Sequence, residues 1–279
     1  MSVRNASPAD VDAVLDLQHA WQREVYGEPR TDRAVLAAHW PDYGHWVADA
    51  GGRLDGYASV SGHGGIEVWV RPGAEGAGVG EALLARIEES HAGPLEAIVP
   101  AAAVSTLSLL EPAGFARVRE VLEMAADLPS EPEAAKWPAG VEPRPYDDAR
   151  DARTVHDCLV EAFAGSDERV APFDEWHPWL LGDPSYDPAV VFVAESDGEM
   201  PGVVQCWVEG FVKDLAVRPR YRGRGIGEAL LRHAFRAFYR RGVRRVSLKV
   251  DATNATGAVR LYHRVGMREV RRYVLCRRA

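Results

Sequence analysis

The spacing of apolar residues changes within one stretch of the chain, residues 211–242. Residues 211–217 form an apolar run rich in β-favouring side chains, which predicts a strand. A turn rich in Arg and Gly follows. Beyond the turn, apolar residues recur at the spacing of one helix face: Ile226, Leu230, Leu231, Phe235 and Phe238. The sequence therefore predicts a strand, a loop and an amphipathic helix, in that order.

Comparable patterns predict alternating strands and helices along both halves of the chain. In the first half, the predicted elements are a hairpin, a strand, a helix, a strand and a helix: 46–50 with 56–61, 66–70, 79–89, 95–99 and 105–110. In the second half, they are helix 150–164, strands 190–194, 202–207 and 211–217, the long helix, strand 246–250, helix 255–265 and strand 270–276. The predicted fold class is α/β, with two tandem domains that each hold a mixed, mostly antiparallel sheet flanked by helices.

The two halves form an internal repeat. Residues 71–84, RPGAEGAGVGEALL, match residues 218–231, RPRYRGRGIGEALL, at an offset of 147. The segments that end at Gly114 and Gly266 match at an offset of 152. Residues 128–140 contain three prolines and few apolar side chains, which is typical of a linker. We therefore predict domains at 1–127 and 141–279.

The loop of the second copy predicts a pyrophosphate-binding site. Gly223, Gly225 and Gly227 remove the side chains that would keep a ligand from the backbone, so N–H groups at the helix start can converge on an anion. Arg222 and Arg224 add positive charge. The loop lacks the lysine of a P-loop, and its glycine spacing differs from the dinucleotide motif G-x-G-x-x-G. A glycine-rich turn that only caps a helix is the alternative.

The same residues resemble the acetyl-CoA loop of the GNAT N-acetyltransferase superfamily, Gln/Arg-x-x-Gly-x-Gly/Ala after a short apolar triplet. Here the triplet is residues 215–217 and the motif is residues 222–227. A second motif agrees at the expected separation, because Asn254 follows a strand and Tyr262 lies in L-Y-x-x-x-G. The resemblance implies acetyl-CoA as co-substrate. The binding residues that it implies are Leu215, Ala216, Val217, Arg222, Gly223, Arg224, Gly225, Ile226, Gly227 and Asn254.

The resemblance also implies catalytic roles. Tyr262 is expected to be the general acid that protonates the departing thiolate, and a backbone N–H near Leu215 is expected to bind the thioester oxygen. Glu209 is the candidate general base, with Asp214 or water as alternatives. Strict alternation places Glu209 on the face of Leu215, and Asp214 on the face of Val212. The competing interpretations are a core tyrosine at position 262 and a solvated turn carboxylate at position 209.

The first copy keeps the glycines and loses the polar residues. The pairs that face each other in the two copies are Glu75 and Arg222, Gly62 and Glu209, Ala102 and Asn254, and Leu110 and Tyr262. A carboxylate in the place of Arg222 repels phosphate. We therefore expect the first half to be non-catalytic, and the sequence leaves open whether it holds CoA through backbone N–H groups alone.

The composition of the chain argues against nucleic-acid-binding, membrane and metal-binding proteins. The chain has 279 residues, of which 47% are hydrophobic, enough for two soluble domains. The net charge of −8 disfavours nucleic-acid binding, although residues 1–130 carry 9 Lys and Arg against 19 Asp and Glu, and the remainder 24 against 22. No signal peptide or membrane span is evident, so we expect a cytoplasmic monomer or homodimer with no membrane partner. We expect no metal site, because the three cysteines lie far apart in the sequence and His177 has no second ligand at a suitable spacing.

The expected reaction is acetyl transfer to a primary amine of a small molecule. Aromatic residues of the second half either line the acceptor pocket or fill the core: Trp176, His177, Trp179 and Trp207. Asp174 and Glu175 suit a cationic amine. The two-copy layout resembles the mycothiol synthase branch of the superfamily, whose acceptor is a cysteinyl pseudodisaccharide, although residues 211–213 depart from its more acidic pattern. The alternatives are an aminoglycoside or polyamine acceptor, and a CoA-binding regulatory protein without turnover.

Overall fold

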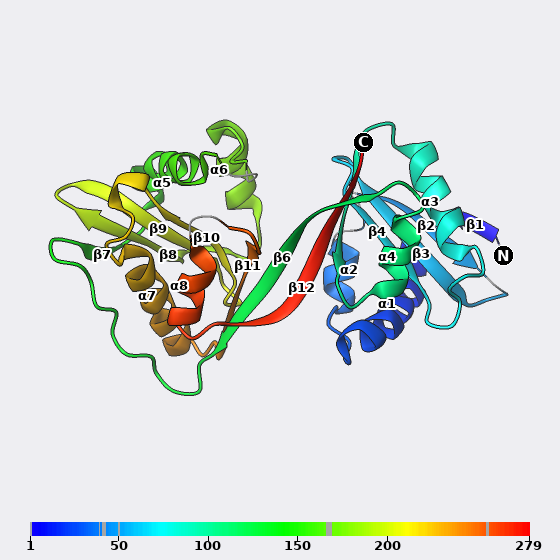
Figure 1. Cartoon of the computed structure of the whole chain (residues 1–279), viewed down its shortest axis with the longest axis horizontal. Coiled ribbons are helices and arrows are strands. Elements are labelled where there is room, and N and C mark those ends of the chain that lie inside the picture. Colours follow the sequence, from blue (N-terminus) through cyan, green and yellow to red (C-terminus); the bar gives the residue numbers. More distant parts are fainter. Residues whose placement is uncertain (1, 39, 41–42, 50, 166–168, 255–256) are drawn as a thin grey trace. The chain divides into compact units, whose positions relative to one another are not determined.

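The computed structural model describes the chain except residues 1, 39, 41–42, 50, 166–168 and 255–256. The chain divides into two compact units (Figure 1). Unit 1 holds residues 1–121, 251–253 and 271–279, and unit 2 holds residues 122–250 and 254–270.

Unit 1 contains an antiparallel sheet with the strand order β1-β2-β3-β4. The strands of its first hundred residues are β1 (Ser2–Asn5), β2 (Tyr43–Asp49), β3 (Leu54–Ser61), β4 (Ile66–Val70) and β5 (Leu95–Pro100). Its helices are α1 (Val11–Tyr26), α2 (Arg33–Ala38), α3 (Val79–Ser90) and α4 (Val104–Leu110). The predicted strands and helices of residues 46–110 agree with these bounds to within three residues.

Unit 2 repeats this arrangement with an antiparallel sheet of order β10-β9-β8-β7. Its strands are β7 (Glu142–Pro145), β8 (Tyr186–Ser196), β9 (Glu199–Trp207), β10 (Val212–Val217) and β11 (Arg245–Asp251). Its helices are α5 (Asp148–Phe163), α6 (Phe173–Gly182), α7 (Ile226–Arg240) and α8 (Ala258–Arg264). The predicted α/β fold class is confirmed. The start predicted for the last helix, residues 255–256, lies outside the described residues.

Two strands, β6 (Ala116–Asp127) and β12 (Arg268–Arg278), contribute several residues to each unit, and β11 contributes its last residue, Asp251, to unit 1. Strand β12 pairs antiparallel with β5, with Tyr273 opposite Pro100 and Arg278 opposite Leu95. Val274 and Cys276 are buried in the apolar core of unit 1. The end of the chain therefore completes the first unit, whereas residues 122–127 belong to the second. This distribution differs from boundaries at residues 127 and 141, because strand pairing joins segments that are far apart in sequence.

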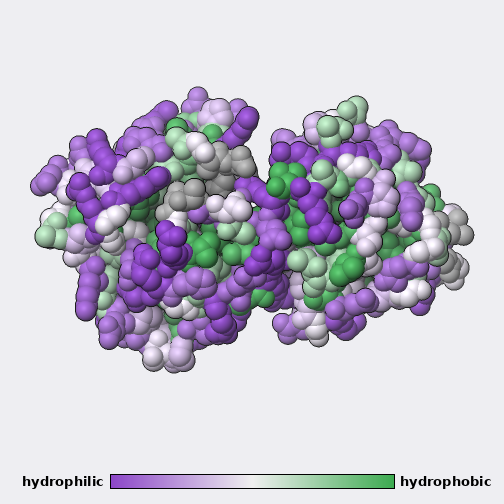
Figure 2. Space-filling view, in the orientation of Figure 1, coloured by the Kyte–Doolittle hydropathy of each residue, from purple (hydrophilic) through white to green (hydrophobic). Residues whose placement is uncertain are grey.

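The apolar stripe predicted from the long helix is buried. Its five residues are at most 3% exposed: Ile226, Leu230, Leu231, Phe235 and Phe238. The three cysteines are also buried, and burial raises the pKa of the Cys158 thiol to about 11, which keeps it unreactive at neutral pH. Figure 2 shows a surface dominated by hydrophilic residues with small apolar patches. Within the described residues, no helix is both long enough and apolar enough to cross a membrane.

Candidate active site

Strand β10 is the edge strand of its sheet. It pairs with β9 on one side, and on the other side Phe211, the residue before β10, forms one isolated parallel bridge with Ser247 of β11. The Arg218 N–H donates to the Pro201 carbonyl of β9 at 2.9 Å. Because alternate residues of a strand direct their N–H groups to opposite edges, the N–H groups of Leu215 and Val217 face the unpaired edge. Beyond the bridge, this edge has no strand partner in the described part of unit 2.

The glycine-rich loop leads into α7 with the backbone that an anion site needs. Gly223 and Gly225 have φ values of +75° and +86°, which only glycine adopts easily. Gly225 is the N-cap of α7 and accepts the first helical hydrogen bond, from Ala229 N–H at 3.0 Å. The N–H groups of residues 226–228 precede that bond, and no side chain caps them. Among the described residues, a Cβ on Gly223 or Gly225 would meet no atom within 4 Å, so the space beside both glycines is open.

The third glycine, Gly227, brings three elements together. A Cβ built on it would lie 3.2 Å from the Leu261 side chain of α8, 3.6 Å from Val217 and 3.9 Å from Leu215. A larger residue would push α7 away from both β10 and α8. The close packing at Gly227 therefore holds the open edge of β10, the start of α7 and helix α8 in one site.

The two loop arginines donate hydrogen bonds to backbone carbonyls. Arg222 donates to the carbonyls of Val217, at 3.2 Å, and Ala162, at 2.7 Å. Arg224 donates to the Arg220 carbonyl at 3.3 Å and lies over a neighbouring tyrosine ring. Both side chains are exposed. Their charges thus lie at the loop, while part of their hydrogen-bonding capacity fixes its shape.

Tyr262 and Asn254 belong to the same unit as the loop. Tyr262 lies on α8 with 8% of its surface exposed, and its carbonyl accepts the Met267 N–H at 3.0 Å. Asn254 is partly buried in the turn between β11 and α8. One short helix therefore carries the candidate acid directly beside the packed contact of Leu261 with α7.

The two candidate bases have different surroundings. Glu209 is exposed in the turn between β9 and β10. The Asp214 side chain is 14% exposed and forms an ion pair of 2.6 Å with Lys213. A bulge at Lys213 shifts the register between Val212 and Asp214. The expectation of strict alternation is therefore wrong, because the extra residue puts Val212 on the same face as Leu215.

A polar and aromatic group lies beside Asp214, on the sheet face covered by α5 and α6. The Lys213 ammonium lies 5.3 Å from the ring centroid of Trp179 and 5.7 Å from that of Trp207. Gln205, opposite Asp214 in register, is 1% exposed, and neither polar atom of its side chain has a hydrogen-bond partner among the residues that the structure describes. Gln205 and Lys213 could not be predicted from the sequence as members of this group, because their positions depend on strand register.

The other predicted aromatic residues form a separate stack. Phe173, Trp176 and His177 have ring centroids 5.1 to 6.1 Å apart. His177 Nε2 contacts the Asp148 carboxylate at 2.9 Å. Trp176 belongs to the buried core, whereas Trp179 is 53% exposed. Of the four aromatic candidates, Trp179 and Trp207 lie nearest to the ion pair at the start of β10.

Comparison with known proteins agrees with this geometry. The model of the acetyltransferase (GNAT) family matches residues 11–101 and 152–267, one match in each copy of the repeat. The chain belongs to the GNAT acetyltransferase family. Members of this family use acetyl-CoA as co-substrate, so the chain is an acetyl-CoA-dependent acyltransferase. The family resemblance proposed from the two motifs is confirmed.

Full-length relatives share the tandem arrangement of this GNAT acetyltransferase. Mycothiol acetyltransferase from Thermomonospora curvata is 31% identical, over 92% of this chain and 89% of the relative. Mycothiol acetyltransferase from Kineococcus radiotolerans is 34% identical, over 93% and 90%. A GCN5-related N-acetyltransferase from Sphaerobacter thermophilus has a TM-score of 0.89 and 30% identity, over 99% and 95% of the two chains. A tandem GNAT protein from the clavulanic acid biosynthesis pathway, at 16% identity and TM-score 0.76, supports the fold alone.

The two GNAT copies share a backbone and differ in their polar side chains. In both, the strand before the loop meets the next strand at one parallel bridge, Gly65 to Glu96 and Phe211 to Ser247. Gly65 and Phe211 differ by 146, whereas matching loop residues differ by 147. The difference of one arises because the bulge adds a residue to the second copy between Phe211 and the loop, and β4 of the first copy has no bulge. The match of Glu209 with Gly62 is therefore wrong, and the residue that faces Glu209 is His63.

An arginine before each GNAT loop also has a structural role that the sequence analysis did not assign. Arg71 donates to the Leu54 carbonyl at 2.7 Å and to Asp16 at 2.8 Å. Arg218 donates to the Met200 carbonyl at 2.9 Å and to Glu161. Both arginines therefore tie the start of the loop to the neighbouring strand, β3 or β9, and to the first long helix of the unit.

No group of three or more His, Cys, Asp or Glu side chains suited to a metal ion occurs within the described residues of this GNAT acetyltransferase.

Proposed function

We propose that unit 2 transfers the acetyl group of acetyl-CoA to a primary amine of a small-molecule acceptor. The observation that carries the proposal is the packing at Gly227, where the open edge of β10, the uncapped start of α7 and helix α8 meet. Only the second copy combines this backbone with Arg222, Asn254 and Tyr262. In the first copy, the Glu75 carboxylate accepts the Gly73 N–H at 2.6 Å and brings negative charge to the loop.

The backbone of unit 2 binds and orients acetyl-CoA in this proposal. The N–H groups of residues 226–228 hold the pyrophosphate at the positive end of the helix dipole. The outward-facing N–H and C=O groups of β10 pair with the amides of the pantetheine arm, next to Asn254. The Leu215 N–H then lies where it can stabilise negative charge on the thioester oxygen.

Two proton transfers complete the reaction. Tyr262 donates its phenolic proton to the departing thiolate, so CoA leaves as the neutral thiol. The attacking amine loses its proton to Glu209, to Asp214 or to water. Asp214 has the lower exposure, and Lys213 compensates its charge.

Paired variants distinguish the two carboxylates. If Glu209 is the base, Glu209→Gln should remove the acidic limb of the profile of kcat/KM against pH. If Asp214 is the base, Asp214→Asn should do so instead. The acidic limb reports a carboxylate that must lose its proton before the reaction. Lys213→Met serves as a control for the ion pair of Asp214. If both amide variants keep the limb, water is the proton acceptor.

The names of the relatives suggest the first acceptor to test. Mycothiol acetyltransferases at 31% and 34% identity span the whole repeat, so we propose the amine of a small cysteinyl sugar conjugate. The aromatic pair Trp179 and Trp207, with Lys213 and Asp214 beside it, offers stacking and ionic contacts for such an acceptor. Because residues 211–213 depart from the pattern of that branch, aminoglycoside and polyamine acceptors belong in the same panel.

A thiol-release assay with acetyl-CoA and this amine panel tests the function. We expect release of CoA that depends on one class of amine and is lost in Tyr262→Phe. Background hydrolysis, measured without amine, is the control. CoA binding by calorimetry with no turnover for any amine would instead favour the regulatory alternative.

A further inference from the structure

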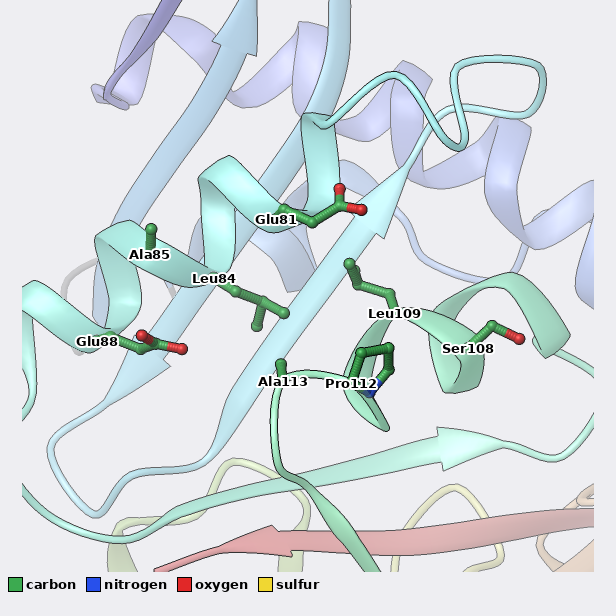
Figure 3. A pocket seen from close by; sticks show the side chains of 8 residues that line it. All are labelled: Glu81, Leu84, Ala85, Glu88, Ser108, Leu109, Pro112 and Ala113. Atoms are coloured by element: carbon green, nitrogen blue, oxygen red, sulfur yellow. The ribbon is translucent and has the colours of Figure 1, made fainter.

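A cavity of about 250 Å³ lies in unit 1 between helices α3 and α4 (Figure 3). Its α3 wall carries the carboxylates of Glu81 and Glu88, and Ala85 lies between them. Its other wall carries Ser108 and Pro112. The charged side chains that line this cavity are therefore both acidic. Its counterpart in unit 2 can be identified residue by residue, because the two copies share hydrogen bonds in this region.

The difference in residue number between matching positions of the two copies is not the same for the two helices. Gly78 and Gly225 are both N-caps, and each accepts the N–H four residues later, at 3.1 and 3.0 Å, which fixes an offset of 147 for α3 and α7. The carbonyls of Leu110 and Tyr262 accept from Phe115 and Met267, at 3.1 and 3.0 Å, which fixes 152 for α4 and α8.

The contact between the helices confirms both offsets. A Cβ on Gly80 would lie 2.5 Å from the Leu109 side chain, and a Cβ on Gly227 would lie 3.2 Å from that of Leu261. The same pair of positions thus packs together in each unit.

Three positions of the acidic cavity are arginines in unit 2. At these offsets Arg232 replaces Ala85, Arg260 replaces Ser108 and Arg264 replaces Pro112. Phe235 also replaces Glu88, whereas Glu81 keeps its charge as Glu228. The formal charge of these five positions is therefore −2 in the first copy and +2 in the second.

Two of these three arginines, Arg232 and Arg264, converge on one carboxylate. Arg232 Nε lies 3.0 Å from Glu228 Oε1, and Arg264 Nε lies 3.4 Å from Glu228 Oε2. These arginines lower the pKa of Glu228, so it stays ionised and balances one of the three positive charges. Arg232 also donates to the Arg264 carbonyl at 3.0 Å. The side chains of Arg232 and Arg264 are 39% and 58% exposed, so both guanidinium groups reach solvent.

We infer that Arg232, Arg260 and Arg264 form a second phosphate-binding site, which takes the 3′-phosphate on the ribose of CoA. The inference rests on the proposed function, because it requires the pyrophosphate to bind at the start of α7. Arg232 lies six residues beyond Ile226, about 9 Å along the helix axis. The 3′-phosphate and the 5′-pyrophosphate are attached to one ribose, so a long arginine side chain on the second turn of α7 spans the distance between them.

The charge difference gives the two copies different ligand preferences. Arginine binds a phosphate dianion through charge-assisted hydrogen bonds, several of which combine at this site. In the first copy, the carboxylates of Glu81 and Glu88 repel the same group, and Ala85 offers it no hydrogen bond. The site in unit 2 therefore selects CoA over a cofactor that lacks the 3′-phosphate.

Calorimetric titration of the full chain with CoA and with 3′-dephospho-CoA tests this site. We expect the wild-type chain to bind CoA about 10- to 100-fold more tightly, as for hydrogen bonds between charged groups. The Arg260→Ser/Arg264→Ala variant should lose most of that preference and keep its affinity for 3′-dephospho-CoA. Arg260→Ser alone, a change to the residue of the first copy at an exposed position, should lose part of it.

Arg240→Ser is the matched control, because it removes the same charge from the far end of α7. It should keep the full preference for CoA. Equal affinities of the wild type for the two ligands, or equal weakening of both by the double variant, would overturn the inference and leave acetyl transfer intact. Failure of the wild type to bind either ligand would overturn both the inference and the proposed pyrophosphate site.

Discussion

Removal of residues 273–279 should destabilise unit 1, although these residues lie at the opposite end of the sequence. They include the part of β12 that pairs with β5 in register, from Tyr273 opposite Pro100 to Arg278 opposite Leu95. Val274, Leu275 and Cys276 are 4%, 2% and 2% exposed. The truncation therefore leaves β5 without this partner and opens the apolar core of the first unit.

The expected loss is comparable to the stability of a whole domain. Full burial of a Val or Leu side chain stabilises a fold by roughly 1.5–3 kcal/mol, so Val274 and Leu275 together contribute roughly 3–6 kcal/mol. Cys276 and the lost ladder hydrogen bonds add to this value. Because a domain is typically stable by only about 5–15 kcal/mol, unit 1 of the truncated chain should unfold in part at room temperature.

Hydrogen exchange measured by mass spectrometry locates the effect. Amides of β5 (Leu95–Pro100) should lose protection, while those of β8 and β9 in unit 2 should keep most of theirs. Removal of Ala279 alone is the control and should change neither. If β5 keeps its protection and the loss is confined to unit 2, the strand pairing described for β12 is wrong, and domain boundaries at residues 127 and 141 would be correct.

Three further predictions concern single side chains. Tyr262→Phe should lower kcat by about 10²–10⁴, measured by stopped-flow, and leave the Kd of acetyl-CoA, measured by calorimetry, nearly unchanged. An unaltered kcat excludes Tyr262 as the acid. Arg222→Glu should weaken CoA binding at least about tenfold in calorimetry, because a carboxylate replaces a cation beside the pyrophosphate; unchanged affinity argues against the site. Burial by itself would raise the pKa of Asp151, but Arg144 and Arg150 hold it well below its ordinary value, so its stabilising effect is complete above pH ~4 and disappears at lower pH. Asp151→Asn should therefore lower Tm more at pH 7 than at pH 2, because the stabilising effect decreases only gradually as the pH falls toward that low pKa. Equal melting curves at pH 7 would contradict this.

Local sequence patterns were sufficient to predict the strand and the helix that flank the loop of the candidate site. The spacing of Ile226, Leu230 and Phe235 indicates which helix face is buried, and all three are at most 3% exposed. The loop was predicted from its glycines to leave the backbone free of side chains, and the structure adds that Gly223 and Gly225 have positive φ. These properties depend on neighbours along the chain, so they can be read directly from the sequence.

Properties that depend on distant partners could not be predicted in this way. Strand β6 was not predicted, and β12 was assigned to the second domain, because each is stabilised by residues far away in sequence. The bulge at Lys213 has no local signature, yet it changes which residues of β10 share a face. The surroundings of Gln205 and Asp214 are likewise set by strand register rather than by sequence spacing.

A matched pair of glycine variants tests the central claim that acetyl-CoA binds at the start of α7 and not at the corresponding helix of the first copy. Gly225 and Gly78 are both N-caps, with φ of +86° and +77°, and an added Cβ meets no atom within 4 Å at either position. Alanine therefore introduces the same backbone strain in both loops, of about 1–2 kcal/mol. The measurement is the calorimetric titration of each variant with CoA. We predict one site per wild-type chain, strong weakening by Gly225→Ala and no change by Gly78→Ala; two equal sites, or weakening by Gly78→Ala alone, would contradict the account.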